Sequence, residues 1–114
     1  MKKDTKEWLA VQELRDALDK KFGQDIMVMD LGNVTTIADF FVIATGTSTP
    51  QLQSLADTAE EIMKKHEFPL GHIEGVRAGE WVLLDFGSII VHLFCKESRE
   101  FYKLERVWGD ANIV

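Results

Sequence analysis

The spacing of apolar residues along the chain predicts two amphipathic helices. Within residues 5–22 the apolar side chains recur every three or four positions, at Trp8, Val11, Leu14, Leu18 and Phe22. Within residues 48–66 a second stripe has the same period and comprises Leu52, Leu55, Ala56, Ala59, Ile62 and Met63. Ser48 or Thr49 is a suitable N-cap for the second helix, and Gly23 is a suitable C-terminal cap for the first. Each helix therefore has one face that must pack against another part of the chain.

Apolar runs without helical spacing predict strands. The run IMVMD spans residues 26–30, and FFVIAT spans residues 40–45. Because FFVIAT has no polar alternation, we expect this strand to be buried on both faces and central in its sheet. A short edge strand is expected within LGHIEG at residues 70–75, and a last helix over residues 98–108, which Gly109 ends.

The stretch EWVLLDFGSIIVHLF, residues 80–94, predicts a β-hairpin. Gly87-Ser88 fits a two-residue type II′ turn, in which Gly takes the positive φ of the first turn position. This turn fixes which residues lie opposite each other. One face holds the pairs Phe86–Ile89, Leu84–Val91 and Val82–Leu93, and the other holds Asp85–Ile90, Leu83–His92 and Trp81–Phe94.

The second face of this hairpin carries too many apolar groups for a surface that is open to solvent. Burying each large apolar side chain is worth about 1.5–3 kcal/mol, so something must cover Trp81 and its neighbours. One interpretation is that the last helix covers them, through Phe101, Leu104 and Trp108. The other is that the part of this face around Trp81 is a protein-docking patch. Both interpretations hold if the helix covers only one end of the face.

The predicted elements follow the order αββαβββα. Strand–helix–strand alternation combined with a hairpin predicts an α/β fold with a single mixed β-sheet and flanking helices. The chain has 114 residues, a length typical of one domain, and we expect residues 1–114 to form that domain.

Composition and charge narrow the function. The net charge of −6 argues against direct sequence-specific binding of nucleic acid, which requires clustered Lys and Arg. Cys95 is the only cysteine, so no internal disulfide can form. The charged start MKKDTKEWLA does not resemble a signal peptide, and no apolar run approaches the ~20 residues of a membrane helix. We therefore expect a cytoplasmic protein that does not contact a membrane.

The sequence does not predict a catalytic site. A nucleotidyltransferase requires a Gly-Ser followed about ten residues later by paired acids that hold Mg²⁺, and the segment IIVHLFCKES after Gly87-Ser88 contains no such pair. The TGTS segment that precedes the second helix is a candidate anion site, and the simpler interpretation is a capped helix start. Its residues are Thr45, Gly46, Thr47 and Ser48.

No metal ion or cofactor is expected either. His66, His72 and His92 have no cysteine partners at the spacing of zinc ligands. Cys95 and His92 lie three residues apart, so in a strand they point to opposite faces and do not form a nucleophile pair. The pattern favours His92 as a packed strand histidine over a pH switch. Asp39 is expected to cap or hydrogen-bond the backbone where the strand over residues 40–45 begins.

Three segments of the chain resemble one protein family in order. They are ADFFVIATGTS at 38–48, EGVRAGEWVLLDFGSIIVHLF at 74–94 and ESREFYKLERVW at 97–108, and they are similar to the ribosomal silencing factor, or Iojap-like, family. The resemblance implies a shape related to nucleotidyltransferases without their chemistry. It implies a translational repressor that acts under nutrient limitation, forms homodimers and binds ribosomal protein number fourteen of the large subunit. Bound there, at the subunit interface, such a protein blocks joining of the small subunit.

The resemblance also implies a docking surface. Its residues in this chain are Trp81, Leu83, Asp85, His92, Arg99, Glu100 and Tyr102. One departure from the family pattern is the hairpin turn, which usually reads Gly-Asp and here reads Gly87-Ser88. Two alternatives remain open: an enzyme that acts on nucleotides through Asp39 and the segment 45–48, and a dimeric scaffold whose apolar hairpin face meets its own copy.

Overall fold

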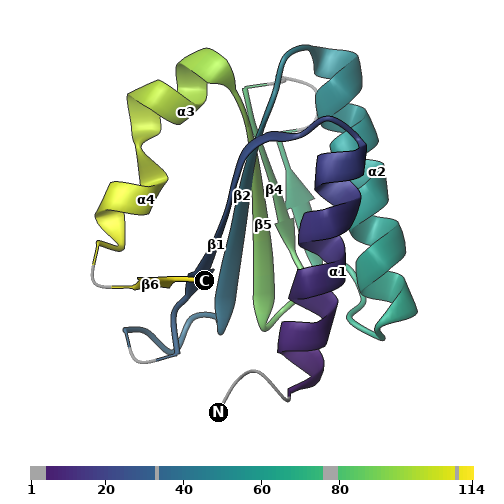
Figure 1. Cartoon of the computed structure of the whole chain (residues 1–114), viewed down its shortest axis with the longest axis vertical. Coiled ribbons are helices and arrows are strands. Elements are labelled where there is room, and N and C mark those ends of the chain that lie inside the picture. Colours follow the sequence, from purple (N-terminus) through teal and green to yellow (C-terminus); the bar gives the residue numbers. More distant parts are fainter. Residues whose placement is uncertain (1–4, 33, 76–79, 110) are drawn as a thin grey trace.

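The elements follow one another along the chain much as the sequence predicts (Figure 1). The computed structural model describes residues 5–32, 34–75, 80–109 and 111–114. The helices are α1 (Lys6–Lys20), α2 (Thr49–Lys65), α3 (Lys96–Tyr102) and α4 (Leu104–Val107). The strands are β1 (Gln24–Asp30), β2 (Phe40–Gly46), β3 (His72–Glu74), β4 (Trp81–Asp85), β5 (Ile89–Cys95) and β6 (Asn112–Ile113).

All described strands belong to one sheet, with the order β3-β4-β5-β2-β1-β6. Strands β2 and β5 pair in parallel and the other neighbours pair antiparallel, which confirms the predicted mixed sheet. Every residue of β2 is buried, as expected for a central strand with large apolar groups on both faces. The short strand β3 lies at an edge, also as predicted.

Helices cover the two faces of the sheet unequally (Figure 1). The long helices α1 and α2 lie side by side on one face, and the short helices α3 and α4 lie on the other. Both long helices begin at a hydroxyl N-cap, of which only Ser48 was predicted. The Ser48 hydroxyl accepts a hydrogen bond from the Gln51 N–H, and the Thr5 hydroxyl accepts one from the Trp8 N–H, both at 3.1 Å.

The hairpin has the predicted register. Trp81 lies opposite Phe94, Leu83 opposite His92 and Asp85 opposite Ile90. Gly87 has a φ of 85°, and the Phe86 N–H donates to the Ile89 carbonyl at 2.9 Å, which closes the two-residue turn. The sequence therefore predicted correctly which side chains of β4 and β5 share a face.

Two predictions about helix ends were wrong, and one strand was not predicted. The last helix is not continuous, because Lys103 takes the left-handed conformation (φ 46°) and separates α3 from α4. The first helix ends at Lys20, and Phe22, not Gly23, occupies the left-handed position after it; the Phe22 ring is 79% exposed. The strand β6, which pairs with β1, has no signal in the sequence because it contains only two residues.

Among the described residues no helix is long and apolar enough to cross a membrane. No group of three or more His, Cys, Asp or Glu side chains in the described part of the chain has a geometry that could hold a metal ion.

Candidate protein-docking surface

The sheet face beneath α3 and α4 is covered only in part. Its buried cluster comprises Met29, Leu31, Ala38, Phe41, Ile43, Ile90 and Phe94. Leu104 and Trp108 of the α4 region pack against this cluster, as one of the two interpretations predicted. The third predicted cover, Phe101, is wrong because its ring is 79% exposed. The C-terminal helices therefore leave β4 incompletely covered, since Trp81 and Leu83 of this strand are only half-buried.

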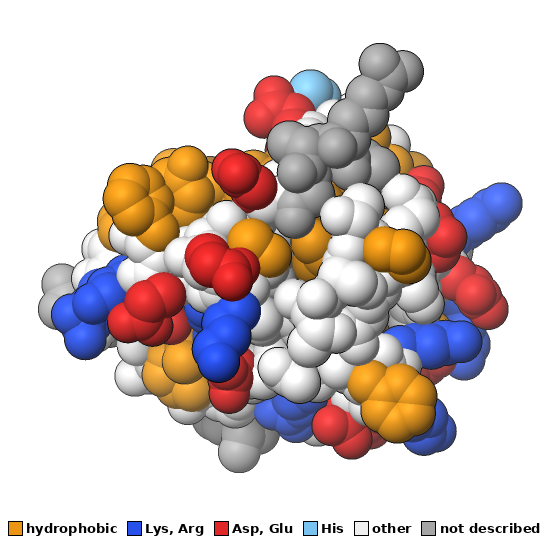
Figure 2. Space-filling model, turned by 90° about the horizontal axis from the view of Figure 1, so that it is seen from above, with side chains coloured by type: hydrophobic (Ala, Val, Ile, Leu, Met, Phe, Trp, Pro, Cys, Tyr) orange, Lys and Arg blue, Asp and Glu red, His pale blue; other side chains and the backbone are white. Residues whose placement is uncertain are grey.

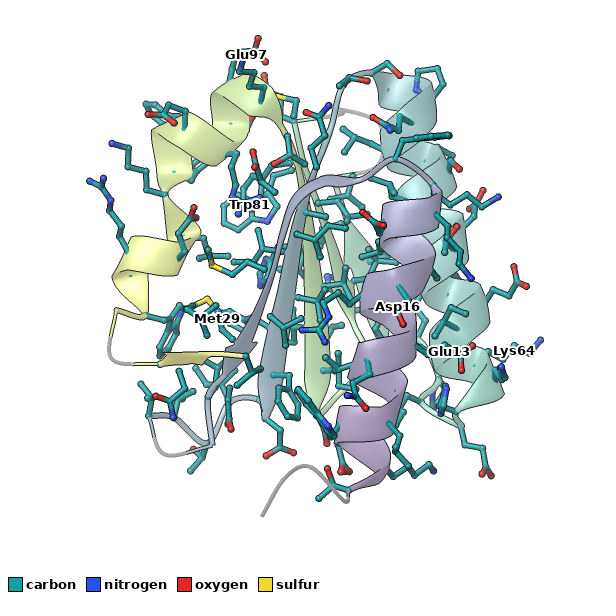
Figure 3. All side chains as sticks on the ribbon, viewed as in Figure 1. Glu13, Asp16, Met29, Lys64, Trp81 and Glu97 are labelled. Atoms are coloured by element: carbon teal, nitrogen blue, oxygen red, sulfur yellow. The ribbon has the colours of Figure 1, made fainter. Side chains whose placement is uncertain are left out.

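Trp81 stands where the cover ends. The residue begins β4 and is half-buried, with its ring centroid 5.0 Å from that of Phe94 and 4.8 Å from that of Tyr102. Figure 3 shows the Trp81 side chain between the sheet and α3. Tyr102, on the last turn of α3, is itself 44% exposed. These aromatic rings form a continuous surface that runs from the buried cluster out to solvent.

His92 lies beneath Trp81 and is 4% exposed. The Trp81 indole Nε1–H donates a hydrogen bond to His92 Nδ1 at 3.1 Å. Burial lowers the pKa of His92 to about 4, since an imidazolium in this apolar cluster would lose its hydration. His92 is therefore neutral at physiological pH. The His92 ring is too buried to touch another molecule directly, and Trp81 is the half-buried residue to which it is hydrogen-bonded.

Arg99 fixes the bend between α3 and α4. The Arg99 residue is only 9% exposed. Its guanidinium donates from Nη1 to the Thr45 hydroxyl at 2.9 Å and from Nε to Glu105 Oε2 at 3.2 Å. One side chain thus connects α3 to the end of β2 and to α4. Because the bend at Lys103 lies directly after Tyr102, Arg99 helps to hold Tyr102 against Trp81.

Gly75 sets the backbone position of Trp81 from the other side. Gly75 has a φ of 84°, and a Cβ atom there would collide with the Trp81 carbonyl oxygen. Only glycine combines that conformation with so close an approach of the two backbones. Gly75 was not among the predicted site residues, although a glycine directly after a short edge strand is a usable signal in the sequence.

Acidic groups border the aromatic surface. Glu80 and Glu97 line a shallow groove together with Ser98, Phe101 and Tyr102. Figure 2, which looks down on the end where α3 begins, shows hydrophobic side chains on the α3 side next to acidic ones. Figure 3 places Glu97 at the outer end of α3, beyond Trp81. The groove itself is lined by acids, whereas Lys103 lies 3.9 Å from Glu100 on α3, so the border carries both charges.

The predicted docking residues divide into three groups. Trp81, Tyr102 and Glu100 reach solvent, and Leu83 is half-buried on the same sheet face. His92 and Arg99 are buried beneath them. Asp85 lies at the far end of β4, four residues from Trp81, or roughly 13 Å along the strand, and its carboxylate accepts the Gly87 N–H at 2.8 Å.

The candidate anion site has its polar groups occupied by the chain itself. Gln51 Oε1 accepts hydrogen bonds from the Thr47 N–H at 2.6 Å and from the Thr47 hydroxyl at 2.9 Å. Ser48 caps α2 and Thr45 is buried against Arg99. Gly46 is explained by packing, because a Cβ atom there would lie 2.8 Å from Leu52 Cδ2. The geometry favours the capped helix start.

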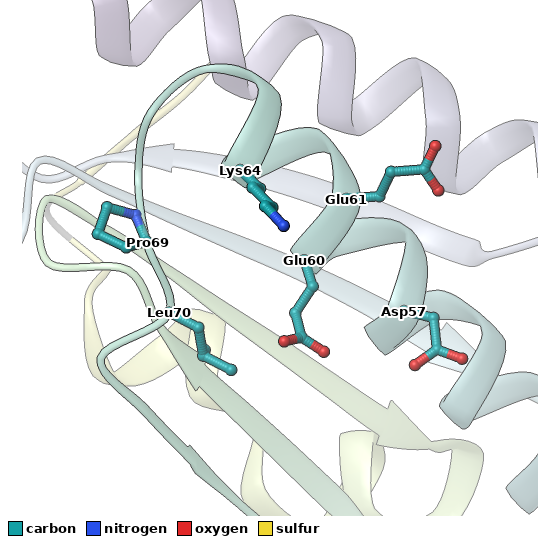
Figure 4. A pocket seen from close by; sticks show the side chains of 6 residues that line it. All are labelled: Asp57, Glu60, Glu61, Lys64, Pro69 and Leu70. Carbon is teal, nitrogen blue, oxygen red and sulfur yellow. The ribbon is translucent and has the colours of Figure 1, made fainter.

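A separate groove lies between α2 and the segment that follows it (Figure 4). Its lining comprises Asp57, Glu60, Glu61, Lys64, Pro69 and Leu70. In the close view Glu60 and Lys64 extend along the groove, whereas Glu61 points toward α1. The three acids of this groove do not form a metal-binding cluster among the residues that the structure describes.

The sequence is similar to those of known proteins over most of its length. The model of a family described as "Ribosomal silencing factor during starvation" matches residues 2–114. A ribosomal silencing factor from Halalkalibacterium halodurans is 34% identical over 99 residues, which are 87% of this chain and 85% of the relative. One from Zymomonas mobilis is 43% identical over 94 residues, which are 82% of this chain and 71% of the relative.

Other similarities extend to an organelle protein and to a solved structure. A mouse protein named "Mitochondrial assembly of ribosomal large subunit protein 1" is 34% identical over 101 residues; the match covers 86% of this chain and 44% of the mouse protein. A crystal structure of a Chromobacterium violaceum protein matches with a TM-score of 0.83 at 31% identity, over 89% of this chain and 84% of the other. With a family model that matches nearly every residue, this chain belongs to the ribosomal silencing factor family.

Proposed function

We propose that this protein represses translation by binding the large ribosomal subunit through the aromatic surface around Trp81. In this proposal the contact is with ribosomal protein number fourteen at the subunit interface, and the bound domain obstructs the small subunit. The action is steric and requires no catalysis. The observation that supports it most directly is the half-buried Trp81 ring at the edge of the cover that α3 and α4 provide.

The chemistry of this surface suits a basic protein partner. Tryptophan and tyrosine are enriched among residues that dominate binding energy, because they bury a large area with few rotatable bonds. Glu80 and Glu97, which line the groove beside Tyr102, offer negative charge for steering a positively charged partner. The net charge of −6 disfavours adhesion to rRNA. The printed name of the mouse relative, which refers to the ribosomal large subunit, is consistent with this partner.

The test is cosedimentation with purified large subunits. We expect the unmodified protein to sediment with them and to reduce joining of added small subunits. Trp81→Ala should weaken binding about 30-fold, as expected for loss of a central aromatic anchor worth about 2 kcal/mol. Leu9→Ala is the matched control, since Leu9 is 54% exposed on α1, which packs on the opposite face of the sheet.

Three outcomes would contradict the proposal. They are an unmodified protein that stays in the supernatant, equal binding by all three proteins, and unimpaired subunit joining by a bound protein. Circular dichroism of Trp81→Ala establishes that the variant is folded, so that lost binding is not lost structure.

We also propose that the protein self-associates as a homodimer. Dimer formation and ribosome binding would then compete for the same apolar surface. Light scattering of Trp81→Glu separates the two uses of Trp81. A dimeric Trp81→Glu that no longer binds large subunits assigns the residue to the ribosome contact. A monomeric product assigns it to the dimer contact instead.

A further inference from the structure

The contact between Trp81 and His92 has features that ordinary packing does not require. His92 is 4% exposed, and its Nε2 has no hydrogen-bond partner among the residues that the structure describes. A buried N–H without an acceptor is unfavourable, and an apolar side chain would avoid it. The imidazole neighbours two apolar rings, with centroids 6.4 Å from that of Phe94 and 4.6 Å from that of Phe41, so a purely apolar residue would suit the position.

The hydrogen bond determines which tautomer His92 adopts. The indole nitrogen of tryptophan only donates, so His92 Nδ1 must accept and carries no proton. The single proton of the neutral ring is then on Nε2, the buried atom without a partner. In the other tautomer two N–H groups would face each other across 3.1 Å, and both would lack an acceptor. The bond to Trp81 therefore favours a tautomer whose second N–H is unsatisfied.

The same bond determines how Trp81 is turned. Contacts with Phe94 and Tyr102 restrict the plane of the indole, but apolar ring contacts do not require its N–H at one particular edge. Rotation of the indole by half a turn about its Cβ–Cγ bond would move Nε1–H away from His92. The hydrogen bond distinguishes these two orientations, and so decides which edge of Trp81 is presented to solvent.

We propose that His92 is a positioning residue for the docking surface: its Nδ1 holds the Trp81 indole in one orientation, ready to bind. The inference rests on the proposed docking role of Trp81. In this inference His92 affects binding only through Trp81 and does not touch the partner itself. An indole that is already oriented loses less conformational freedom on binding, so the complex is tighter.

The test is a double-mutant cycle with His92→Phe and Trp81→Phe. His92→Phe keeps an aromatic ring and removes the acceptor, and Trp81→Phe keeps an aromatic ring and removes the donor. We expect His92→Phe to weaken large-subunit binding about threefold to tenfold, the range for one lost neutral hydrogen bond. In the Trp81→Phe background the same substitution should have no further effect, because the bond is already absent.

A conservative variant and a control sharpen the result. His92→Asn retains an oxygen acceptor near the position of Nδ1 and should recover most of the binding lost in His92→Phe. Thermal unfolding of each variant is measured alongside. If the role of His92 were only structural, binding and stability would fall together, and the loss would be the same in both backgrounds.

Nuclear magnetic resonance of the free protein tests the inference without the ribosome. The ¹⁵N shifts of His92 should identify Nδ1 as unprotonated and Nε2 as protonated. The Trp81 indole N–H should be protected from hydrogen exchange, and this protection should disappear in His92→Phe. These signals separate the two proposals: if they are found and no large-subunit binding is detected, the docking role fails while the orientation of Trp81 by His92 stands.

The inference is overturned by a protonated Nδ1, by equal effects of His92→Phe in both backgrounds, or by unchanged binding and unchanged indole exchange in His92→Phe. If His92→Phe does not fold, the ¹⁵N shifts of the unmodified protein and the binding of His92→Asn still decide between these outcomes.

Discussion

The two faces of the sheet are built from similar apolar residues but are closed to different degrees. Beneath α1 and α2, the described residues form a cluster with 20 buried members and five partly buried ones. Beneath α3 and α4 the corresponding cluster has seven buried members and six partly buried ones. Figure 3 shows both sides, with Trp81 and Met29 on the partly covered face and Glu13 and Lys64 on the side of α1 and α2.

Helix length explains the difference. Helices α1 and α2 have 15 and 17 residues, which is roughly 22–26 Å of helix at 1.5 Å per residue. Helices α3 and α4 have seven and four residues and are bent at Lys103, so they cover only the middle of the sheet. The strand β4, at one side, keeps Trp81 and Leu83 partly open. The surface that we propose for docking is therefore an ordinary core face that the helices cover incompletely.

The closed face should be the more sensitive to truncation. Leu55 on α2 is fully buried, and Leu55→Ala should lower the free energy of unfolding by about 3 kcal/mol through lost burial and a residual cavity. Leu83→Ala on the partly open face should cost about 1 kcal/mol, because that side chain is only half-buried. Urea denaturation of both variants measures the two losses.

Binding should show the reverse order. At a temperature where both variants are folded, Leu55→Ala should sediment with large subunits like the unmodified protein, and Leu83→Ala should bind less well. Equal stability losses, or equal binding by the two variants, would contradict the comparison between the faces.

Acid should destabilise the protein through His92. The pKa of His92 is about 4 in the folded state and near 6.5 when unfolded, so between these values the unfolded chain binds the proton and the folded one does not. Stability is therefore full above about pH 6.5 and falls as pH decreases, by about 2 kcal/mol at pH 5. Urea denaturation at pH 7.5 and pH 5 measures this loss, and His92→Phe is the control that should lack it.

On the side of α1 and α2, Glu13 is a second acid-sensitive group, and it responds over a different pH range from His92. Hydrogen bonds from Lys65 and His66 lower the pKa of Glu13, so its contribution is present above the ordinary glutamate range and is lost at lower pH. Equal losses of unfolding free energy between pH 7.5 and pH 5 in His92→Phe and in the unmodified protein would show that His92 is not the source of the acid sensitivity.

The bend between α3 and α4 should loosen when Arg99 is replaced. Arg99→Met leaves the Thr45 hydroxyl and the Glu105 carboxylate without their donor, and should cost about 1–2 kcal/mol because Glu105 is partly hydrated. Hydrogen exchange should accelerate in α3 and α4 and remain slow in α1 and α2. Uniform acceleration in all four helices would show that Arg99 supports the whole fold instead of one face.

The elements of this fold were predictable where one pattern dominates. The helical stripe of α2, the apolar run of β2 and the Gly87-Ser88 turn each specify a structure by themselves, and all three were confirmed. The bend at Lys103 was not predictable, because a left-handed lysine is disfavoured locally and is accepted here only through tertiary contacts such as those of Arg99.

The candidate site was predictable as a face but not in depth. Alternation along β4 and β5 correctly grouped Trp81, Leu83 and His92 on one side of the sheet. The sequence does not show that the His92 ring is buried while Tyr102 reaches solvent, because the burial of both depends on where α3 ends. The hydrogen bond between Trp81 and His92 joins neighbouring strands, so it has no signature in the sequence.

The smallest expected effect concerns the turn that departs from the family pattern. Ser88→Asp restores the usual Gly-Asp at an exposed loop, and the free energy of unfolding should change by less than about 0.5 kcal/mol. The added charge lies in the turn beyond Asp85, which is itself about 13 Å along β4 from Trp81, and at that distance salt screens most of its effect on a partner. Large-subunit binding measured at low and at high salt should therefore change less than twofold. A larger increase that vanishes in salt would extend the docking surface along the whole of β4 to the turn.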